Sequence, residues 1–406
     1  MRLGFPLLAV PLLALSVARA EAVEFAFSGY LDARVLAPAE EKSWVQGGLG
    51  KFRFGPDRGN FRFVEAIGQV QASFSSELSA IVVGRLEPTD SAGLDFLEAY
   101  ALYAPRAAGD LSWSVKAGAF FPSISMENDD IGWQSPYTIT PSAINTWIGE
   151  ELRTIGAEAT LRWNAGAFGT LSVIGSILCC NDETGILMAD RGWGLHDRTT
   201  GLLERIRMPD ATIRIFRQKP PFYSGEFDEI DGDVGAYGGI VWQLPDSLGK
   251  ISVIRYDNNA DPAALSARDT GWDTRFWAFG ARTQFDNIIL IGQHMAGTTS
   301  VVSRGTLMVT KFQSAFLLAS LDWEDWRFAM RGDVFQTRKT PAATPSPFSE
   351  DGGALTIAVS YTGIANLRLA GEVLVMGNHR LEYRNDGLPV HLTTSQAQLS
   401  ARYSVN

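Results

Sequence analysis

The sequence predicts an all-β protein, a transmembrane antiparallel β-barrel of about 16 strands whose third outer loop folds inward. Three observations predict it. Apolar and polar residues alternate in runs of about ten, short and long connections alternate between these runs, and aromatic residues gather beside the short connections. With 46% hydrophobic and only 20% charged residues, the chain is not a disordered protein.

The N-terminal residues are typical of a secretory signal peptide. Arg2 precedes an apolar stretch from Leu3 to Val17, and Ala18-Arg19-Ala20 forms a small-x-small cleavage site. We therefore expect residues 1–20 to be removed and residues 21–406 to form the exported barrel. The formal charge is −10, and loss of two arginines makes it more acidic, so we expect no nucleic-acid partner.

The predicted strands follow from period-two alternation. For example, Leu355, Ile357 and Val359 alternate with Thr356, as expected for a strand whose two faces meet different solvents. A weaker run at 25–36 extends the first strand or raises the strand number to eighteen. The sixteen main runs are 43–54, 61–74, 77–86, 95–104, 111–121, 152–163, 168–178, 233–243, 249–258, 273–285, 287–296, 307–321, 325–338, 353–363, 365–377 and 393–405.

The connections between these runs fall into two classes. Short turns alternate with longer segments, and both chain ends fall on the short-turn side, which is the connectivity of a bacterial outer-membrane barrel. A soluble β-sandwich, the alternative, seldom has so many long loops. The longer segments are 55–60, 87–94, 122–151, 179–232, 259–272, 297–306, 339–352 and 378–392.

Aromatic residues should mark the two membrane surfaces, because Trp and Tyr collect where hydrocarbon meets water. An inner girdle beside the short turns is predicted from Trp113, Trp163, Phe168, Trp242, Phe285, Trp323 and Trp326. An outer girdle beside the long loops is predicted from Phe121, Tyr256, Trp272 and Phe276.

The segment 122–151 is the candidate for an inward loop, because a barrel of this width leaves an aqueous lumen. It carries three prolines and a short predicted helix from the cap Ser142 to Ile148. Here the chain resembles the sixteen-stranded bacterial porins, whose third loop forms the constriction. The stretch Val115 to Pro122 is similar to the strand before that loop in the phosphate-selective porin O/P type, although the final residues, Val405-Asn406, lack the aromatic end usual in such proteins.

This resemblance implies passive diffusion of small hydrophilic solutes through a homotrimer in the bacterial outer membrane. Charged residues on the lumen face should then set selectivity, since a charge facing lipid is costly. The predicted constriction residues are Glu127, Asp129, Asp130, Trp133, Tyr137, Trp147, Glu150 and Glu151. The predicted wall charges are Glu98, Lys116, Glu158, Arg162, Arg282, Arg327, Arg331, Asp333, Arg368 and Glu372. Together they predict an acidic loop facing a more basic wall.

The segment 179–232 is predicted to be a long external loop with its basic residues ahead of its acidic ones. Three interpretations stay open: a vestibule that concentrates anions, a site for lipopolysaccharide phosphates, or pairing with the acidic end of the same loop. The candidate vestibule residues are Arg205, Arg207, Arg214, Arg217 and Lys219.

The adjacent cysteines, Cys179 and Cys180, are expected to remain free thiols, because neighbouring side chains diverge. The four histidines show no ligand spacing and no serine lies in a G-x-S-x-G motif, so we expect no metal, no cofactor and no enzymatic activity.

The predicted function is a porin for small polar or anionic solutes in contact with outer-membrane lipid and lipopolysaccharide. The alternative from a different class is a plugged barrel that serves as a surface-binding or envelope structural protein. Trp133 and Trp147 fit a constriction and a plug equally well.

Overall fold

The computed structural model describes residues 22–56, 60–88, 93–211, 221–266, 269–340 and 348–405. The predicted signal peptide 1–20 lies outside the described residues, as do Arg214, Arg217 and Lys219. Within the described ranges, no helix is long and apolar enough to cross a membrane.

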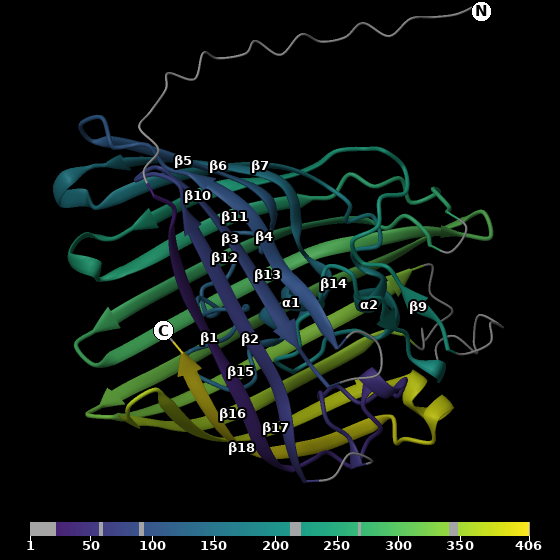
Figure 1. Cartoon of the computed structure of the whole chain (residues 1–406). Coiled ribbons are helices and arrows are strands. Elements are labelled where there is room, and N and C mark those ends of the chain that lie inside the picture. Colours follow the sequence, from purple (N-terminus) through teal and green to yellow (C-terminus); the bar gives the residue numbers. More distant parts are fainter. Residues whose placement is uncertain are drawn as a thin grey trace, which may run out of the picture.

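Sixteen antiparallel strands close into one barrel, which confirms the predicted fold and excludes eighteen strands. The first strand pairs with the last, with Ala33 opposite Ala401, so the sheet has no open edge. The short turns and the C-terminus lie at one end of the barrel and the long loops at the other (Figure 1). The barrel strands are β1 Glu24–Ala37, β2 Phe61–Ser73, β3 Leu78–Leu86, β4 Leu94–Tyr103, β5 Leu111–Phe120, β6 Thr154–Asn164, β7 Thr170–Cys179, β10 Gly235–Gln243, β11 Gly249–Asp257, β12 Asp273–Phe285, β13 Ile288–Ser303, β14 Thr306–Trp323, β15 Trp326–Thr340, β16 Glu350–Ile364, β17 Leu367–Arg380 and β18 His391–Val405.

The remaining elements lie in the connections. Four loops recur below: loop 1 (38–60) joins β1 to β2, loop 2 (87–93) joins β3 to β4, loop 3 (121–153) joins β5 to β6, and loop 4 (180–234) joins β7 to β10. The smaller elements are α1 Ala143–Glu151, α2 Ile186–Asp190, η1 Trp44–Gln46, η3 Gly166–Phe168, η4 Pro245–Ser247, η5 Leu381–Asp386 and the two-stranded β8 Ile206–Arg207 with β9 Tyr223–Ser224.

Two boundaries differ from the prediction. The weak run at 25–36 is the true first strand, paired on both sides, whereas 43–54 is no strand and belongs to loop 1. In this segment consecutive residues such as Lys51 and Phe52 are both buried, so exposure does not alternate as it does in a barrel strand. The reason is that the segment lies inside the lumen and is covered on all sides. The predicted outer loop 297–306 is mostly strand, since β13 and β14 stay paired up to Ser303 opposite Thr306.

The two faces of the wall differ as a membrane barrel requires. All seven residues of the predicted inner girdle are exposed on the outside, with Phe168 75% exposed, as expected for side chains that contact the lipid surface. The predicted outer girdle is wrong. Phe121, Tyr256, Trp272 and Phe276 are buried, because each occupies an inward position or a loop packed inside the lumen.

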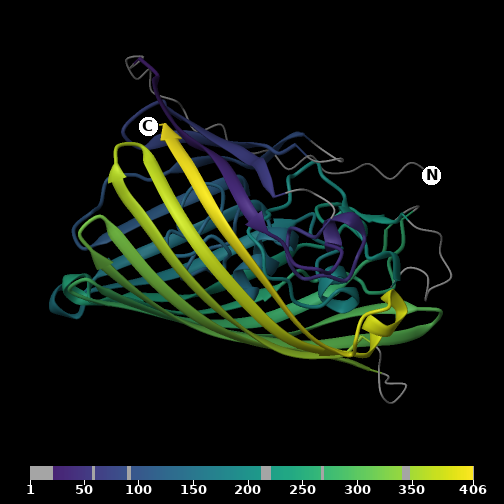
Figure 2. The ribbon, with the colours of Figure 1, turned by 90° about the horizontal axis from the view of Figure 1, so that it is seen from below.

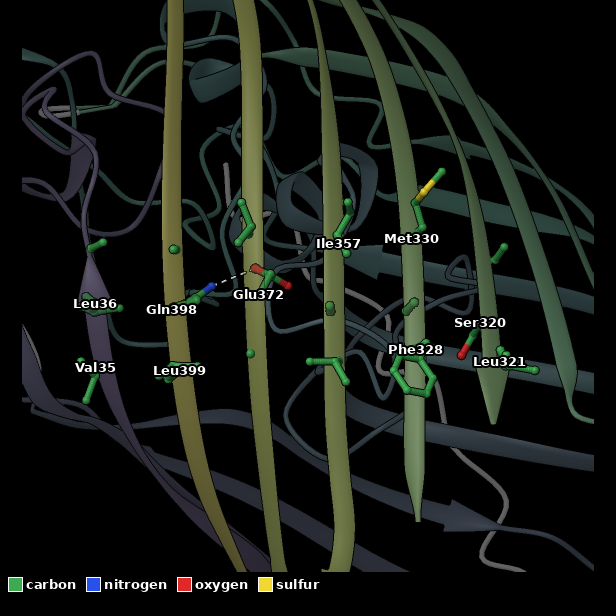
Figure 3. A pocket seen from close by; sticks show the side chains of 18 of the residues that line it. Val35, Leu36, Ser320, Leu321, Phe328, Met330, Ile357, Glu372, Gln398 and Leu399 are labelled. Atoms are coloured by element: carbon green, nitrogen blue, oxygen red, sulfur yellow. Dashed lines mark hydrogen bonds between the residues drawn. The ribbon is translucent and has the colours of Figure 1, made fainter. Parts of the chain in front are cut away.

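A shallow apolar groove of about 860 Å³ crosses the outer surface from β13 to β18 and β1 (Figure 3). Small residues such as Ala319, Gly371 and Ala397 lie between larger exposed side chains, among them Met330 and Leu399. Glu372 and Gln398, hydrogen-bonded to each other in Figure 3, alternate with these outward residues and are themselves buried. The outer surface of the wall is therefore apolar here, whereas its lumen surface is polar.

Candidate functional site in the lumen

Loop 3 folds into the barrel, as predicted. Its helix α1 begins after Ser142, whose hydroxyl accepts a hydrogen bond from the amide of Asn145 at 3.3 Å. All nine residues of α1 are buried, and the helix lies within the ring of strands (Figure 1). The sequence places this helix correctly because its cap and its apolar residues are local signals.

Three predicted wall charges fasten loop 3 to the barrel. Arg331 on β15 donates to Glu127 of the loop at 2.8 Å. The amide of Ala143, at the start of α1, donates to Asp333 at 3.1 Å, and the amides of Ile139 and Thr140 donate to Glu372. These groups are buried, so they anchor the loop and do not face a passing solute.

An aromatic cluster fills the centre of the lumen. The ring of Trp147 on α1 lies 5.5 Å from Phe276, 5.1 Å from Phe312 and 6.0 Å from Trp193 of loop 4. Aromatic rings bury large apolar areas, and pairs of rings at these distances add further stabilisation. Trp147 therefore packs loop 3, loop 4 and the wall together.

Loop 4 also enters the barrel, which the sequence analysis did not predict. Its residues 191–204, here called the luminal segment, carry Asp197, whose carboxylate lies 2.5 Å from Arg34 of β1 and 3.1 Å from Arg53 of loop 1. The two guanidinium groups overcome the effect of burial and hold the pKa of Asp197 below its usual range. Figure 2 shows loops 1 and 4 inside the ring of strands.

This contact is part of a larger buried ion-pair network. Arg53 also contacts Glu65 at 3.1 Å and Glu87 at 2.9 Å, and Arg198 contacts Glu87 at 3.2 Å. The network contains five acidic and five basic groups. Equal numbers are expected, because a buried charge without a counter-charge is strongly destabilising. Its members are Asp32, Glu65, Glu87, Asp197, Glu204, Arg34, Arg53, Arg85, Arg198 and Arg402.

A second network joins the luminal segment to α1. Glu150 lies 2.5 Å from Arg191 and 2.9 Å from His196. Burial raises the pKa of Glu150, but these two neighbours outweigh it and lower the pKa to about 2. Gly192 (φ 77°) passes so close to the wall that a Cβ would lie 2.3 Å from Glu350. Glu151 is buried as well and accepts from the amides of Gly185 and Leu187, so neither predicted constriction acid faces water.

Together, these loops fill the half of the lumen beside the long loops. Every barrel strand has a buried inward side chain in that half, none more than 7% exposed. One from each strand, in order, is Arg34, Glu65, Val83, Leu97, Phe120, Thr154, Leu178, Tyr237, Tyr256, Phe276, Thr299, Phe312, Thr337, Thr356, Met376 and Thr394. In that half, loop residues therefore cover inward side chains on every strand of the barrel.

The other half of the lumen holds a polar cavity of about 560 Å³. Loop 3 supplies one side, with the exposed residues Asp129 and Asp130. The wall supplies the other, with Lys116 of β5, Arg162 of β6 and Lys250 of β11. The wall side of the cavity also carries the carboxylates of Glu98 and Glu158, so it holds three basic and two acidic side chains.

Of the predicted wall charges, Glu98, Lys116, Glu158 and Arg162 line this cavity, whereas Arg282, Arg327 and Arg368 contact loop 3. Lys116 pairs with Glu158 at 2.9 Å, Arg282 pairs with Asp129 at 2.8 Å, and Glu98 accepts from the amide of Phe121 at 3.1 Å. Arg327 and Arg368 both donate to the carbonyl of Pro136 in loop 3. Tyr137 lies buried between Arg282 and Arg327, and Trp133 stacks on Phe121 at 4.5 Å.

Sequence reasoning missed Lys250 and most of the ion-pair network. Lys250 shares its parity with the inward residues Ser252 and Ile254 of β11, so the alternation did contain its signal. Arg34 lies on the strand that was treated as weak. Asp197 sits in an irregular loop, and no periodic pattern could have placed it against Arg53.

The described vestibule arginines are paired within loop 4 or with the adjacent loop. Arg205 contacts Asp228 at 2.9 Å and also Asp269, and Arg207 contacts Asp210 at 3.1 Å. Of these contacts, only the pair of Arg205 with Asp228 joins the basic part of loop 4 to its acidic end, as in the third interpretation.

Cys179 and Cys180 form a disulfide, so the prediction of free thiols is wrong. Cys180 has φ 64°, and this left-handed conformation brings its side chain back toward Cys179 where a continuing strand would turn it away. The bridge lies where β7 passes into loop 4, and the Cys180 amide donates to Glu229 at 2.8 Å.

No protein-family model matches this chain, and no curated protein sequence matches it. Solved structures are similar in fold. The outer membrane channel DcaP of Acinetobacter baumannii has a TM-score of 0.59 at 11% identity, covering 96% of this chain and 100% of that chain. The anion-selective porin from Comamonas acidovorans has a TM-score of 0.52 at 10% identity, covering 94% and 100%. OmpT of Vibrio cholerae, in a trimer form, has 0.53 at 9% identity, covering 95% and 100%. The chain thus has the fold of sixteen-stranded porin-like β-barrels.

Proposed function

We propose that the protein is a bacterial outer-membrane porin through which small hydrophilic solutes, anions included, diffuse passively. The observation that carries the proposal is the polar, charged cavity inside a closed barrel whose outer face is apolar. A barrel that only anchors to lipid does not require such a cavity. Placing charged side chains inside a barrel costs free energy unless a counter-charge or a solute compensates them.

A second function is favoured by one observation, the burial of inward side chains around the whole outer half of the lumen. A barrel that stayed in this conformation would conduct nothing and would act as a surface-binding or envelope structural protein. The two functions differ in whether the luminal segment can leave the lumen.

The deciding experiment is single-channel recording in a planar bilayer under a salt gradient. The full chain is compared with a variant in which residues 191–204 are replaced by a Gly/Ser linker of the same length, which keeps the reach of loop 4. For a porin we expect discrete conductance steps from the full chain, and larger or longer steps from the variant. Silence from the full chain with conductance from the variant would favour the second function, and silence from both would refute the porin.

We further propose that the protein forms a homotrimer, as the trimer form of OmpT from Vibrio cholerae suggests. The apolar groove over β13 to β1 offers a face where small residues allow close approach of a second copy. Gly371→Trp would fill this groove. We expect the wild-type protein to migrate as a trimer on unheated gels and the variant as a monomer with an intact barrel. A monomeric wild type would refute the trimer.

The lipid-facing partners are proposed on the same physical grounds. The apolar outer band contacts acyl chains, and the partly exposed Arg205 and Arg207 of loop 4 are the described basic groups that lipopolysaccharide phosphates can approach. Because Arg205 and Arg207 are paired with acids of the protein, we expect their replacement by serine to change lipopolysaccharide binding only slightly.

A further inference from the structure

Two cations on the wall of the polar cavity lack an acidic partner. Arg162 of β6 donates from Nη1 to the hydroxyl of Ser114 at 2.9 Å. Among the described residues, no carboxylate oxygen lies within 4.0 Å of a side-chain nitrogen of Arg162 or of Lys250. Two other cations of the wall, Lys116 and Arg282, are each paired with an acid. Hydroxyl groups of Thr160 and Ser172 line the same side, so this wall is suited to a carboxylate.

Loop 3 brings one acidic group without a basic partner to the opposite side of the cavity. Asp130 at the tip of loop 3 accepts a hydrogen bond from the amide of Ile131 and has no basic side chain within 4.0 Å among the described residues. The side chain of Asp129 is 55% exposed even though it pairs with Arg282. This side is suited to a cation that enters from the lumen water.

The space between the two sides fits a small molecule. The volume of about 560 Å³ lies within the range of ligand sites. The stacked rings of Phe121 and Trp133 line it, together with Leu102 and Val241.

We infer that this cavity binds small amphoteric solutes, namely amino acids and short peptides that carry one carboxylate and one ammonium group. The carboxylate faces Arg162 and Lys250, and the ammonium group faces Asp130 and Asp129. The inference deepens the proposed function and rests on it, because it names the class of solute for which the pore has an internal site.

The test is calorimetric binding to the full chain in detergent with three matched probes. Glycylglycine carries both charges, N-acetylglycylglycine lacks the ammonium group, and glycylglycinamide lacks the carboxylate. We expect glycylglycine to bind at least about fivefold more tightly than either analogue, which corresponds to about 1 kcal/mol for each matched charge.

Variants assign each charge to its side of the cavity. Arg162→Gln and, separately, Lys250→Gln should weaken glycylglycine and N-acetylglycylglycine by a similar factor and leave glycylglycinamide unchanged. Asp130→Asn should weaken glycylglycine and glycylglycinamide only. Arg106→Gln, in the exposed turn between β4 and β5, removes one positive charge outside the cavity and should change nothing. Heat-modifiable migration on gels confirms that each variant folds.

Equal affinity for the three probes, tightest binding of the acetylated probe, or no binding would each overturn the inference. Binding in detergent requires no conduction, so the two proposals fail separately. Selective binding without conductance in a bilayer would refute the porin and retain the site. Conductance without selective binding would support the porin and refute the binding site.

Discussion

Arg331 of β15 and Glu127 of loop 3, 204 residues apart, form a buried ion pair of 2.8 Å between the barrel wall and the inward loop. Arg331 also donates to the carbonyl groups of Thr140 and Pro141. A residue expected to select solutes thus holds the loop in place. The same holds for Asp333 and Glu372, so structural anchors and solute-facing charges occupy the same face of the wall.

Replacing Arg331 by methionine should release loop 3, because it leaves Glu127 and Asp333 buried without their counter-charge. Breaking a buried pair costs about 3–5 kcal/mol. We expect amide hydrogens around Ile139 and Thr140 to exchange much faster, as measured by hydrogen exchange with mass spectrometry.

The matched control is Arg338→Met on the same strand. Arg338 forms an exposed pair with Asp351, worth about 1 kcal/mol or less. Equal exchange in the two variants would show that the Arg331 anchor does not hold the loop.

Trp147→Ala should separate loop 3 from loop 4, since it removes the ring that contacts Trp193, Phe276 and Phe312. Loss of a buried aromatic side chain costs about 3–5 kcal/mol. We expect faster protease cleavage within both loops. The control, Trp323→Ala in the exposed inner girdle, should leave the loops resistant, and resistance in Trp147→Ala itself would contradict the prediction.

Asp197→Asn should favour the open pore, because it withdraws the negative charge shared by Arg34 and Arg53 and leaves both cations repelling each other. The expected result is a higher open probability in single-channel records, by about tenfold or more if about 1.4 kcal/mol of coupling is lost. Asp228→Asn is the control in the same loop, where the carboxylate is half exposed and pairs with Arg205. An unchanged open probability would show that the ion pairs do not hold the luminal segment.

The packing of loop 4 should depend on pH. The hydroxyl of Ser224 lies 2.8 Å from Glu183 and 2.7 Å from Glu226, yet it has one proton to donate, so one carboxyl must carry a proton. Burial, and then the charge of Asp269, raises the pKa of Glu183 to about 7. Burial, and then the charges of Glu151 and Glu183, raises the pKa of Glu226 well above its ordinary value.

The direction follows from these raised pKa values. The packed loop favours the neutral carboxyls, so their contribution is complete below pH 4.5 and is lost as the pH rises through about 7. We expect protease to cleave loop 4 about tenfold faster at pH 8 than at pH 5, normalised to a substrate peptide. Glu226→Gln should flatten the profile, and a flat wild-type profile would refute the mechanism.

The sequence predicted the barrel because its signals are local. The alternation of Leu355, Ile357 and Val359 with polar residues predicts which side chains face lipid, and the loop lengths predict the connectivity. The cap Ser142 likewise predicted α1. The first strand shows the limit of this reasoning, because the sequence assigned it to 43–54 and the structure forms it from 25–36. Both segments alternate, and only pairing with β18 and β2 distinguishes them.

The sequence by itself therefore determined the fold class, an approximate strand number, the inward third loop and the polar face of the wall. Only the tertiary structure decided that loops 1 and 4 enter the lumen, that Arg331 and Glu372 are anchors, and that Arg162 and Lys250 remain free to meet a solute. The physical reason is that alternation assigns a charge to a face, whereas its role depends on which distant group lies opposite. Asp197 and Arg34 meet across 163 residues, and no local pattern encodes that distance.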